Sequence, residues 1–577
     1  MHTKILNRRR QAAVLASLIL IGSTSTTLAD SGDLDPAFGV GGIVNTDITL
    51  GDDRAQRIAV LADGKILVAG TGIQNGNEVQ TVAKFLPDGS LDTAFGTNGK
   101  VIGPSGTGYG LALQTDGKFV VTGYVWTGTR FDFLVTRYHP NGSLDSDFSG
   151  DGVVITNVGG SESQAYAVVI QPDDKILVAG YSGLSGAFDF ALLRFNPDGS
   201  PDTSFSGDGK VVSSVTSGDD RAYSLALQTD GKILLAGSGG SLNDGGLEVV
   251  RYDSTGNFDT TFGVGGIVFL DDVTDCRAVC IQADGKILVS GAARVGTGAT
   301  YDFAVARFNA DGSLDPSFSE DGIVYTNLRD NDDGGTCMSL DLAGRIVVGG
   351  TSLENNTSGR KDYALVRYKP NGALDLDFSR DGKIITEMAE SDDFARSLVV
   401  LPNNMVVVAG FTQAPQLGGY GSYLLARYEG HDTDGDGLND SVETNTGTYL
   451  SPTQTGTNPF NPDSDGDGLI DGLEVSRYES NPLNKDSDGD GFDDGFEVST
   501  GFDPTSNTSV PLTTSILLTA VEFRFLAPAG KVLKIEASSD LQSWYSIEND
   551  IAGTGTTLTR FYSVQTIPKR YFRVTEQ

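Results

Sequence analysis

The chain has 577 residues, with 76 acidic and 41 basic side chains that give a formal net charge of −35 at pH 7. A surface this acidic repels phosphate backbones, which excludes nucleic acid as a partner, and it attracts cations. The length is enough for several domains.

Residues 1–29 have the pattern of a secretory signal peptide. Lys4 and Arg8 to Arg10 precede an apolar run over residues 12–22, and Ala29 is a small residue suited to cleavage. The run is too short to cross a bilayer as a helix, and no later run approaches that length. Cleavage removes these four cations and no acid, so the charge of −35 becomes −39. We expect an exported protein, secreted or at the cell surface, without a transmembrane segment.

A ten-residue segment recurs between residues 30 and 430. It reads QADGKILVSG at residues 282–291 and LADGKILVAG at residues 61–70. Seven copies occur, the last two degenerate, at steps of 53, 57, 57, 54, 59 and 60 residues. The Asp-Gly pair inside the segment suits a tight hairpin turn that needs a positive φ. A long period of this kind indicates a repeat architecture.

Each unit contains four short runs rich in valine and isoleucine. In the third unit these runs are residues 165–170, 175–180, 190–195 and 209–212. Helical periodicity is almost absent before residue 430. Four short strands repeated seven times predict an all-β fold, a seven-bladed β-propeller over residues 30–430.

The two ends of the repeat array are complementary. The chain enters with a segment of the fourth-strand type, which contains Ile43-Val44, and leaves with one of the third-strand type, which contains Leu424-Leu425. Pairing between these segments would close the ring and remove free sheet edges. We therefore predict that they lie in the same sheet.

Two residue pairs recur with the same period. An aspartate followed three places later by phenylalanine occurs at Asp35/Phe38, Asp92/Phe95, Asp145/Phe148, Asp202/Phe205, Asp259/Phe262, Asp315/Phe318 and Asp375/Phe378. A cation followed by an aromatic residue occurs at Lys84, Arg137, Arg194, Arg251, Arg307, Arg367 and Arg427. A catalytic group is needed once, whereas a joint is needed in every blade, so seven copies indicate scaffolding. We expect each aspartate to cap its turn and to pair with a nearby arginine, while the aromatic residue fills the space between blades.

The unit as a whole is similar to a known repeat. Its Leu-Asp-x-x-Phe start, its Asp-Gly-Lys-Ile-Leu-Val-Ala-Gly centre and its Arg-Tyr-x-Pro-Asp-Gly-Ser end resemble the bacterial delta-sixty β-propeller repeat, over roughly residues 31–430. The resemblance implies a seven-bladed propeller. It implies no defined activity and no catalytic residue.

Propellers usually bind ligands at the mouth of the central channel, on loops where the copies differ. The segments that enter the first strand of several units are acidic, at Asp52-Asp53, Glu162, Asp219-Asp220, Asp332-Asp333 and Asp392-Asp393. They would form either a ring of solvated loops or a mouth that holds a cation and repels anions. His139 lies in a repeat turn and His431 at a domain edge, so neither a histidine triad nor a zinc centre is predicted, and no catalytic residue is assigned.

The three cysteines occupy positions of small residues. Cys276 and Cys280 stand where the preceding unit has alanines, and Cys337 stands where the preceding unit has Ala278. Cys276 and Cys280 lie about 13 Å apart along a strand, too far to bridge each other. We expect small buried residues in place of alanine.

After Gly430 the composition turns acidic, and three loops repeat one spacing. Each places carboxylates at positions 1, 3, 5, 9 and 12, glycine at position 6 and a backbone carbonyl at position 7, which is the register of a calcium loop. The expected ligands are Asp432, Asp434, Asp436, Leu438, Asp440 and Glu443 in the first loop, Asp463, Asp465, Asp467, Leu469, Asp471 and Glu474 in the second, and Asp486, Asp488, Asp490, Phe492, Asp494 and Glu497 in the third. Carboxylates this close repel each other by roughly a few kcal/mol per pair, and a hard divalent cation relieves the repulsion. Calcium fits better than magnesium because many carboxylates converge without reserving waters.

The loops differ from EF-hands, because no amphipathic helix precedes them and prolines follow them. The motifs Thr457-Asn458-Pro459 and DSDGDG at residues 463–468 resemble thrombospondin type 3 repeats. The resemblance implies a calcium-wrapped stalk with little core over residues 431–507. A dockerin is the alternative, but it would have two loops with longer helices, which the third loop and the prolines disfavour.

Residues 508–577 return to short β runs, at 515–518, 521–526, 532–537, 545–547 and 571–574. The run from Ile535 to Trp544 and the RYFR segment at residues 570–573 resemble a small C-terminal β-sandwich of bacterial secreted proteins, which implies no function. Trp544 is either a core residue or a residue that stacks on a sugar.

The parts together indicate an exported calcium-binding scaffold or adhesion protein, expected to be monomeric, whose propeller binds an extracellular protein or glycan. The alternative is a calcium-assisted extracellular hydrolase or lyase with a site at the channel mouth. An enzyme needs a base or a nucleophile at that mouth, and the sequence offers acidic loops without either. Binding is therefore favoured over catalysis.

Overall fold

The computed structural model describes residues 31–240, 246–295, 300–354, 359–388, 391–413, 421–430, 434, 436, 438–440, 442–452, 454–509, 520–538, 542–563 and 571–576. The expected signal peptide, the run at 515–518 and the expected ligand Asp432 lie outside the described residues. The chain divides into two compact units between Asn445 and Thr446. Within the described ranges, no helix is both long and apolar enough to cross a membrane.

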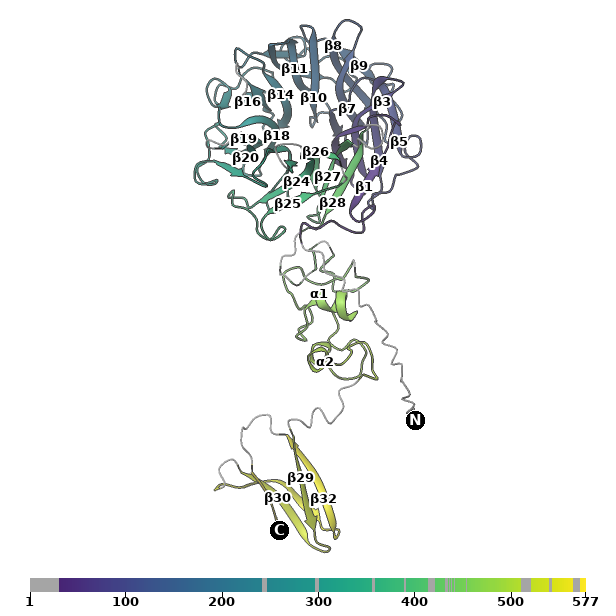
Figure 1. Cartoon of the computed structure of the whole chain (residues 1–577), viewed down its shortest axis with the longest axis vertical. Coiled ribbons are helices and arrows are strands. Elements are labelled where there is room, and N and C mark those ends of the chain that lie inside the picture. The colour runs from purple at the N-terminus through teal and green to yellow at the C-terminus, as the bar shows by residue number, and fades with distance from the viewer. Residues whose placement is uncertain are drawn as a thin grey trace, which may run out of the picture. The chain divides into compact units, whose positions relative to one another are not determined.

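The first unit consists of antiparallel four-stranded sets arranged around a common centre (Figure 1). The first strands are β2 (Arg54–Val60), β6 (Gly110–Leu113), β10 (Glu162–Ile170), β14 (Arg221–Leu227), β18 (Thr274–Ile281), β22 (Asp333–Leu340) and β26 (Asp392–Val400). The second strands are β3 (Ile66–Gln74), β7 (Phe119–Trp126), β11 (Ile176–Leu184), β15 (Ile233–Gly239), β19 (Ile287–Arg294), β23 (Ile346–Leu353) and β27 (Val406–Gln413).

The outer half of each set follows the same order. The third strands are β4 (Asn77–Phe85), β8 (Phe131–Tyr138), β12 (Ala187–Phe195), β16 (Gly246–Tyr252), β20 (Tyr301–Phe308), β24 (Lys361–Tyr368) and β28 (Gly421–Tyr428). The fourth strands are β5 (Lys100–Ser105), β9 (Val153–Thr156), β13 (Lys210–Ser213), β17 (Ile267–Leu270), β21 (Ile323–Thr326), β25 (Lys383–Thr386) and, for the last set, β1 (Ile43–Thr46). A single parallel pair, Glu162 with Phe131, joins two neighbouring sets into an eight-stranded sheet.

The first strands form a closed cycle. Each contacts the first strand of the next set, and β26 contacts β2. The predicted closure is confirmed, because β1 pairs antiparallel with β28 and places Ile43 opposite Ala426 and Val44 opposite Leu425. The β-propeller fold is therefore as predicted, and we infer seven blades from the cycle of seven first strands.

The apolar run of each second strand is continuous because both of its faces are buried. Ile66 and Val68 of β3 pack into one interblade core, and Leu67 and Ala69 pack into the next. Strands covered on both sides read as unbroken apolar runs rather than alternating ones. The hairpin turn before this strand has the predicted positive φ, at 77° for Gly64.

The predicted blade joint is confirmed, and one arginine shows how it is built. The Arg194 Nε donates to Asp202 at 2.7 Å, and its guanidinium lies 4.4 Å from the centre of the Phe205 ring. A second guanidinium nitrogen donates to the carbonyl of Ser254 in the next unit at 2.7 Å. Asp202 also accepts the backbone N–H of Ser204 at 3.0 Å, which caps the turn. The same carboxylate pairing and ring contact recur at Arg137, Arg251, Arg307, Arg367 and Arg427.

One blade joint departs from the pattern. Its aspartate, Asp92, pairs with Lys65 at 3.2 Å, and Lys84 lies 5.6 Å from the centre of the Phe95 ring. Lysine has no planar fork, so it does not hold a carboxylate and a neighbouring carbonyl as arginine does.

The cysteines are free thiols, as expected. Cys276 and Cys337 are buried, and Cys280 is half-buried against an interblade core. Burial raises the pKa of the Cys280 thiol to about 12, and the same cause raises that of Cys337 to about 12. All three thiols therefore stay protonated and act as packing groups.

The second unit has short helices followed by strands. The helices are α1 (Asp471–Leu473), the π-helical turn η2 (Glu474–Tyr478) and α2 (Asp494–Thr500). The strands are β29 (Ala520–Ala527), β30 (Val532–Ser538), β31 (Tyr545–Ala552), β32 (Thr556–Ser563) and β33 (Tyr571–Glu576), of which β32 has no counterpart among the predicted runs. Strands β29 and β32 form one sheet and β31, β30 and β33 another, and Ala527, Leu558, Ile535 and Val574 share a core between them. This is the predicted small β-sandwich.

Candidate functional site

The three acidic loops that follow the propeller bury carboxylates where a folded segment normally buries apolar groups. Asp471, Glu474, Asp494 and Glu497, at positions 9 and 12 of the second and third loops, are all 0% exposed. Among the described residues from 438 to 509, the buried apolar side chains are Leu438, Leu469, Val475 and the prolines Pro482 and Pro504. Ionised carboxylates are held inside a protein only when they are paired or when they coordinate a metal.

The second and third loops have the same internal hydrogen bonds. Position 1 accepts three backbone N–H groups, which in the second loop are those of Gly466 at 2.8 Å, Asp467 at 3.3 Å and Gly468 at 3.1 Å, all to Asp463. Position 9 accepts the N–H of position 2, from Ser464 to Asp471 at 2.7 Å and from Ser487 to Asp494 at 2.8 Å. Gly468, at position 6, has a φ of 95°, which fits the sharp turn expected there.

The same bonds turn the remaining carboxylate oxygens inward. In the described residues, three groups of carboxylates have oxygen atoms within 4.8 Å of one another, namely Asp434, Asp436 and Glu443; Asp463, Asp465 and Asp467; and Asp486, Asp488 and Asp490. At positions 9 and 12, oxygen atoms of Glu474, Asp494 and Glu497 are buried without a hydrogen-bond partner in the described part of the chain. No lysine or arginine of that part pairs with these three side chains.

A hydrogen bond from a backbone N–H to a carboxylate joins the second and third loops. The N–H of Gly495, in the third loop, donates to Asp467 of the second loop at 2.7 Å. A side chain at Gly495 would lie 2.7 Å from the Asp467 carbonyl oxygen, so only glycine allows this approach. The two loops are therefore mechanically coupled.

Burial and mutual repulsion raise the pKa of these acids. Burial, followed by the charge of Asp467, raises the pKa of Asp465 to about 7. Burial and the charges of Asp465 and Asp467 raise that of Glu474 to about 9, and burial and the charge of Asp490 raise that of Glu497 to about 7. A divalent cation would displace the retained protons and supply the missing positive charge. The buried oxygen donors therefore fit a hard cation.

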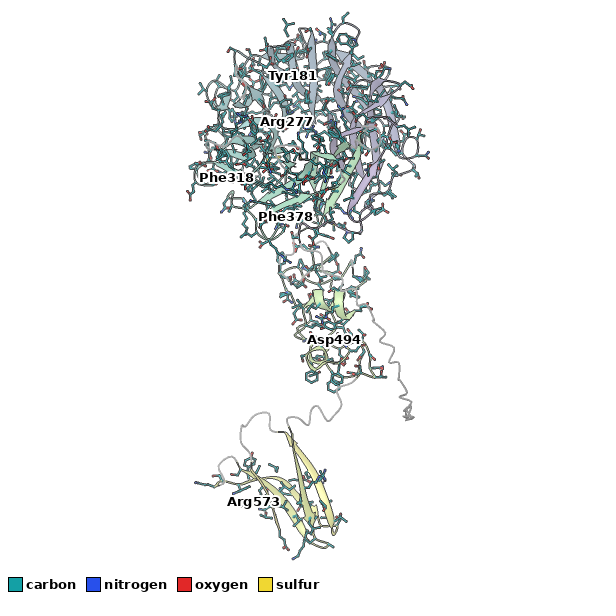
Figure 2. All side chains as sticks on the ribbon, in the orientation of Figure 1. Tyr181, Arg277, Phe318, Phe378, Asp494 and Arg573 are labelled. Carbon is teal, nitrogen blue, oxygen red and sulfur yellow. The ribbon has the colours of Figure 1, made fainter. Side chains whose placement is uncertain are left out.

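A cavity of about 260 Å³ lies at the centre of the propeller. It is lined by Arg54, Gln56, Arg57, Tyr109, Tyr166, Tyr223, Arg277, Thr336, Arg396 and Phe411. All except Tyr109, which directly precedes β6, and Phe411, which lies in β27, belong to first strands. Figure 2 shows Arg277 toward the middle of this unit and Phe318 and Phe378 toward its rim.

Six of the seven first strands, all except β6, have a register shift at a residue that lines this cavity. The pairing of first and second strands shifts register at Gln56, Tyr166, Tyr223, Thr336 and Arg396, which leaves each of these residues without a partner on the second strand. Arg277 lies in the corresponding shift of β18. A bulge re-aims a side chain, and here it turns the unpaired residue toward the centre of the ring.

The last glycine of the repeated segment makes room for the bulge. A side chain there would lie between 1.8 and 2.7 Å from a carbonyl oxygen of the first strand or, for Gly123, of Thr107 just before it, which is closer than real contacts come. The seven glycines are Gly70, Gly123, Gly180, Gly237, Gly291, Gly350 and Gly410. A glycine that recurs in all seven units thereby leaves room for the unpaired residue, which differs between units.

Three consecutive blades contribute tyrosines to the cavity lining, and arginines line it from other blades. The ring centres of Tyr109 and Tyr166 are 4.6 Å apart, and the Arg277 guanidinium lies 4.0 Å from the centre of the Tyr223 ring. Burial raises the pKa of Tyr166, which keeps its hydroxyl a hydrogen-bond donor rather than a base. Within the described residues that line the cavity there is no histidine and no carboxylate.

The acidic pairs at the strand entries contribute hydrogen bonds to the scaffold, and none of the carboxylate groups close enough to hold a metal ion in the described residues lies among them. The second aspartate is buried and holds its own loop, as when Asp53 accepts the N–H groups of Ile48 at 2.7 Å and Thr49 at 2.9 Å. The first aspartate reaches the preceding blade, as when Asp219 accepts the N–H of Phe188 at 3.1 Å. In the described residues, the groups of carboxylates close enough to hold a metal ion all lie in the three acidic loops after the propeller.

Trp544 is half-buried and covered by an arginine. The Arg573 guanidinium lies 4.2 Å from the centre of its ring, and Trp544 is not among the residues of the sandwich core. Trp544 is therefore not one of the core residues, and its role in stacking on a sugar stays a prediction.

Sequence reasoning did not single out the cavity residues, although a signal was present. Tyr109, Arg277 and Arg396 each stand between two small residues, and the same holds for Ala165-Tyr166-Ala167, Ala222-Tyr223-Ser224 and Gly335-Thr336-Cys337. The flanking small residues repeat while the middle one changes. This alternation marks the strand position where the blades differ.

Comparison with protein families identifies two kinds of repeat. The domain of unknown function DUF5122 β-propeller matches residues 61–95, 114–148, 171–205, 228–262, 282–318 and 344–378. The bacterial TSP3 repeat matches residues 432–448, 463–485 and 486–507. The chain therefore carries DUF5122 β-propeller repeats followed by bacterial thrombospondin type 3 repeats, as the sequence motifs predicted. No curated protein matches the chain in sequence.

Several solved structures are distantly similar. Polysaccharide lyase Uly1 has a TM-score of 0.38 at 10% identity, covering 65% of this chain and 89% of its own. A PL25 ulvan lyase has a TM-score of 0.38 at 10% identity, covering 70% of this chain and 95% of its own. Sqt1 from Chaetomium thermophilum has a TM-score of 0.32 at 11% identity, covering 66% of this chain and 97% of its own. Scores this low carry no argument about what the present chain does.

Proposed function

We propose that the chain is an exported calcium-binding scaffold whose propeller binds an extracellular protein or glycan. The observation that carries the calcium assignment is the set of fully buried carboxylates at Asp471, Glu474, Asp494 and Glu497. Calcium would be held by the carboxylates at positions 1, 3, 5, 9 and 12 of each loop and by the backbone carbonyls of Leu438, Leu469 and Phe492. When bound, it supplies the positive charge that lets this acidic segment fold.

Export rests on the amino-terminal segment. Its cationic start, short apolar run and small residue at Ala29 support cleavage by a signal peptidase. Intact-mass measurement of the protein from culture medium and cell-surface fractions tests this. A chain beginning at Asp30 is expected, and a full-length chain confined to the cytoplasm would contradict it.

Binding is favoured over the alternative, a calcium-assisted hydrolase or lyase at the channel mouth. The acidic entry loops are engaged in scaffold hydrogen bonds, and the described lining of the central cavity offers no histidine or carboxylate as a base. The test is to measure binding and turnover on the same set of extracellular proteins and polysaccharides. Saturable binding without product formation is expected, and turnover abolished by a cavity variant would favour the enzyme.

A further inference from the structure

The central cavity carries positive charge in a protein whose overall charge is strongly negative. Four arginines line it, and only two of them have a carboxylate partner, because Arg54 pairs with Asp52 and Arg277 pairs with Asp275 at 2.6 Å. The Arg396 Nε is buried with no hydrogen-bond partner among the described residues, and its guanidinium lies 5.4 Å from the centre of the Phe411 ring. Arg57 has no ion pair with any described carboxylate and lines both this cavity and a smaller one beside it.

Buried guanidinium groups without counter-charges favour an anionic ligand. Burial lowers the pKa of Arg57, and burial together with the positive charge of Arg277 lowers that of Arg396. Both groups nevertheless remain charged at neutral pH, because an arginine hardly ever loses its proton. Their fork of N–H donors matches the oxygen geometry of a carboxylate or a sulfate.

The rest of the lining fits a sugar ring. Tyr109, Tyr166 and Tyr223 line the cavity and combine apolar rings with polar hydroxyl groups, which suits a ligand with both C–H and hydroxyl groups. Gln56 and Thr336 add side chains that both donate and accept hydrogen bonds. The volume of about 260 Å³ lies near the lower end of ligand pockets, so it admits a small unit of a chain molecule and excludes a folded surface.

We propose that the central cavity binds an acidic sugar residue, one bearing a carboxylate or a sulfate group, as part of an extracellular glycan. This inference rests on the proposed binding function and specifies its ligand class. Arg57 and Arg396 hold the anionic group, and the tyrosines pack against the ring. The acidic exterior disfavours polyanions that cannot reach these arginines, so recognition requires insertion of the residue into the cavity.

The test is calorimetric titration of the full exported chain in calcium with four probes of similar length. They are neutral galactan, oligogalacturonate, sulfated galactan and a peptide of alternating aspartate and serine. Oligogalacturonate or sulfated galactan is expected to bind at least tenfold more tightly than neutral galactan, and which of the two binds identifies the anionic group. Arg396→Ala is expected to weaken that binding at least tenfold, and Arg396→Lys less. Arg130→Ala, which alters an exposed arginine away from the cavity, is the matched control.

Circular dichroism shows whether Arg396→Ala is folded, and a second variant keeps the test decisive if it is not. Gln56→Glu places a negative charge beside Arg57. It is expected to weaken the binding of the acidic probes and to leave the binding of neutral galactan unchanged. Equal binding of neutral and acidic galactans, preference for the peptide, or indifference to both variants overturns the acidic-sugar proposal and leaves the general binding function standing. If no protein or glycan binds at all, both proposals fail.

Discussion

Arg427 and Asp35 form an ion pair across almost the whole propeller sequence, with the arginine Nε donating to the carboxylate at 2.5 Å. Five other blades make the same joint between residues eight apart, such as Arg194 and Asp202. The last blade therefore borrows its turn and its fourth strand from the amino-terminal segment. Closure of the ring depends on residues that the chain supplies first and last.

Breaking this joint should destabilise the whole propeller. Asp35→Ala leaves the nearly buried Arg427 without its counter-charge and removes the turn cap at Ala37. Loss of one partner of a buried pair costs about 3–5 kcal/mol, and chemical denaturation of the full chain measures it. Asp63→Ala, at an aspartate that is 57% exposed, serves as the control and should change the unfolding midpoint little. Equal effects of the two substitutions would show that the joint is not the closing element.

The glycine behind the bulge should be intolerant of any side chain. In Gly180→Ala, the added carbon would lie 1.9 Å from the Gln164 carbonyl oxygen, so the strand must move. We expect a loss of about 1–3 kcal/mol or more in the free energy of unfolding, and weaker ligand binding because Tyr166 is displaced. Gly334→Ala is the matched control, since its nearest neighbour would be 3.7 Å away. A Gly180→Ala protein as stable as the control would refute the proposed role of the glycine.

Glu248 should make stability depend on pH. Burial, followed by the negative charge of Asp220, raises the pKa of Glu248 from 4.5 to about 9. The folded state therefore holds a proton that the unfolded state releases above pH 4.5, so its contribution to stability falls as pH rises from 4.5 to about 9. Glu248→Gln removes this loss and should stabilise the protein at pH 7 by up to about 3 kcal/mol, with little effect at pH 4.5. Melting temperatures across this range, with the exposed Glu78→Gln as control, test it; a pH-independent difference would contradict it.

The third calcium loop should lose its ion when one buried ligand is changed. Asp494→Asn and Glu497→Gln keep the shape of the side chain and remove the charge. Each should weaken calcium binding by at least about tenfold, since even outer-shell changes have effects of that size. Asp503→Asn, at an exposed aspartate beyond the loop, should leave binding unchanged. The Gly495 N–H donates to Asp467, so calcium binding by the second loop should also weaken. Unchanged calcium binding by the second loop would show that the two loops bind calcium independently.

Much of the scaffold was predictable because its residues repeat. The period revealed the strands, and the recurring aspartate, arginine and phenylalanine marked the joint as structural. The closing strand followed from the complementary ends of the array. Strand β32 was missed because its threonine-rich sequence resembles a polar loop more than a half-buried strand.

The two candidate sites differ in how far their residues lie apart in the sequence. The clustering of the loop carboxylates was predictable because the predicted ligands of each loop lie within twelve consecutive residues. The cavity was not, because Gln56, Tyr166 and Arg396 are separated by more than one hundred residues and meet only when the ring closes. The hydrogen bonds of the entry aspartates were not predicted, because a sequence does not show whether an acidic pair faces water or a neighbouring backbone, as Asp53 does.

Calcium uptake by the full exported chain, measured by equilibrium dialysis with circular dichroism in parallel, tests the proposed scaffold most directly. The account predicts three calcium ions per chain, with dissociation constants on the order of 10⁻⁴ to 10⁻³ M, and an increase in ordered structure on binding. A chain that takes up no calcium in this range, and whose spectrum does not change, would contradict it.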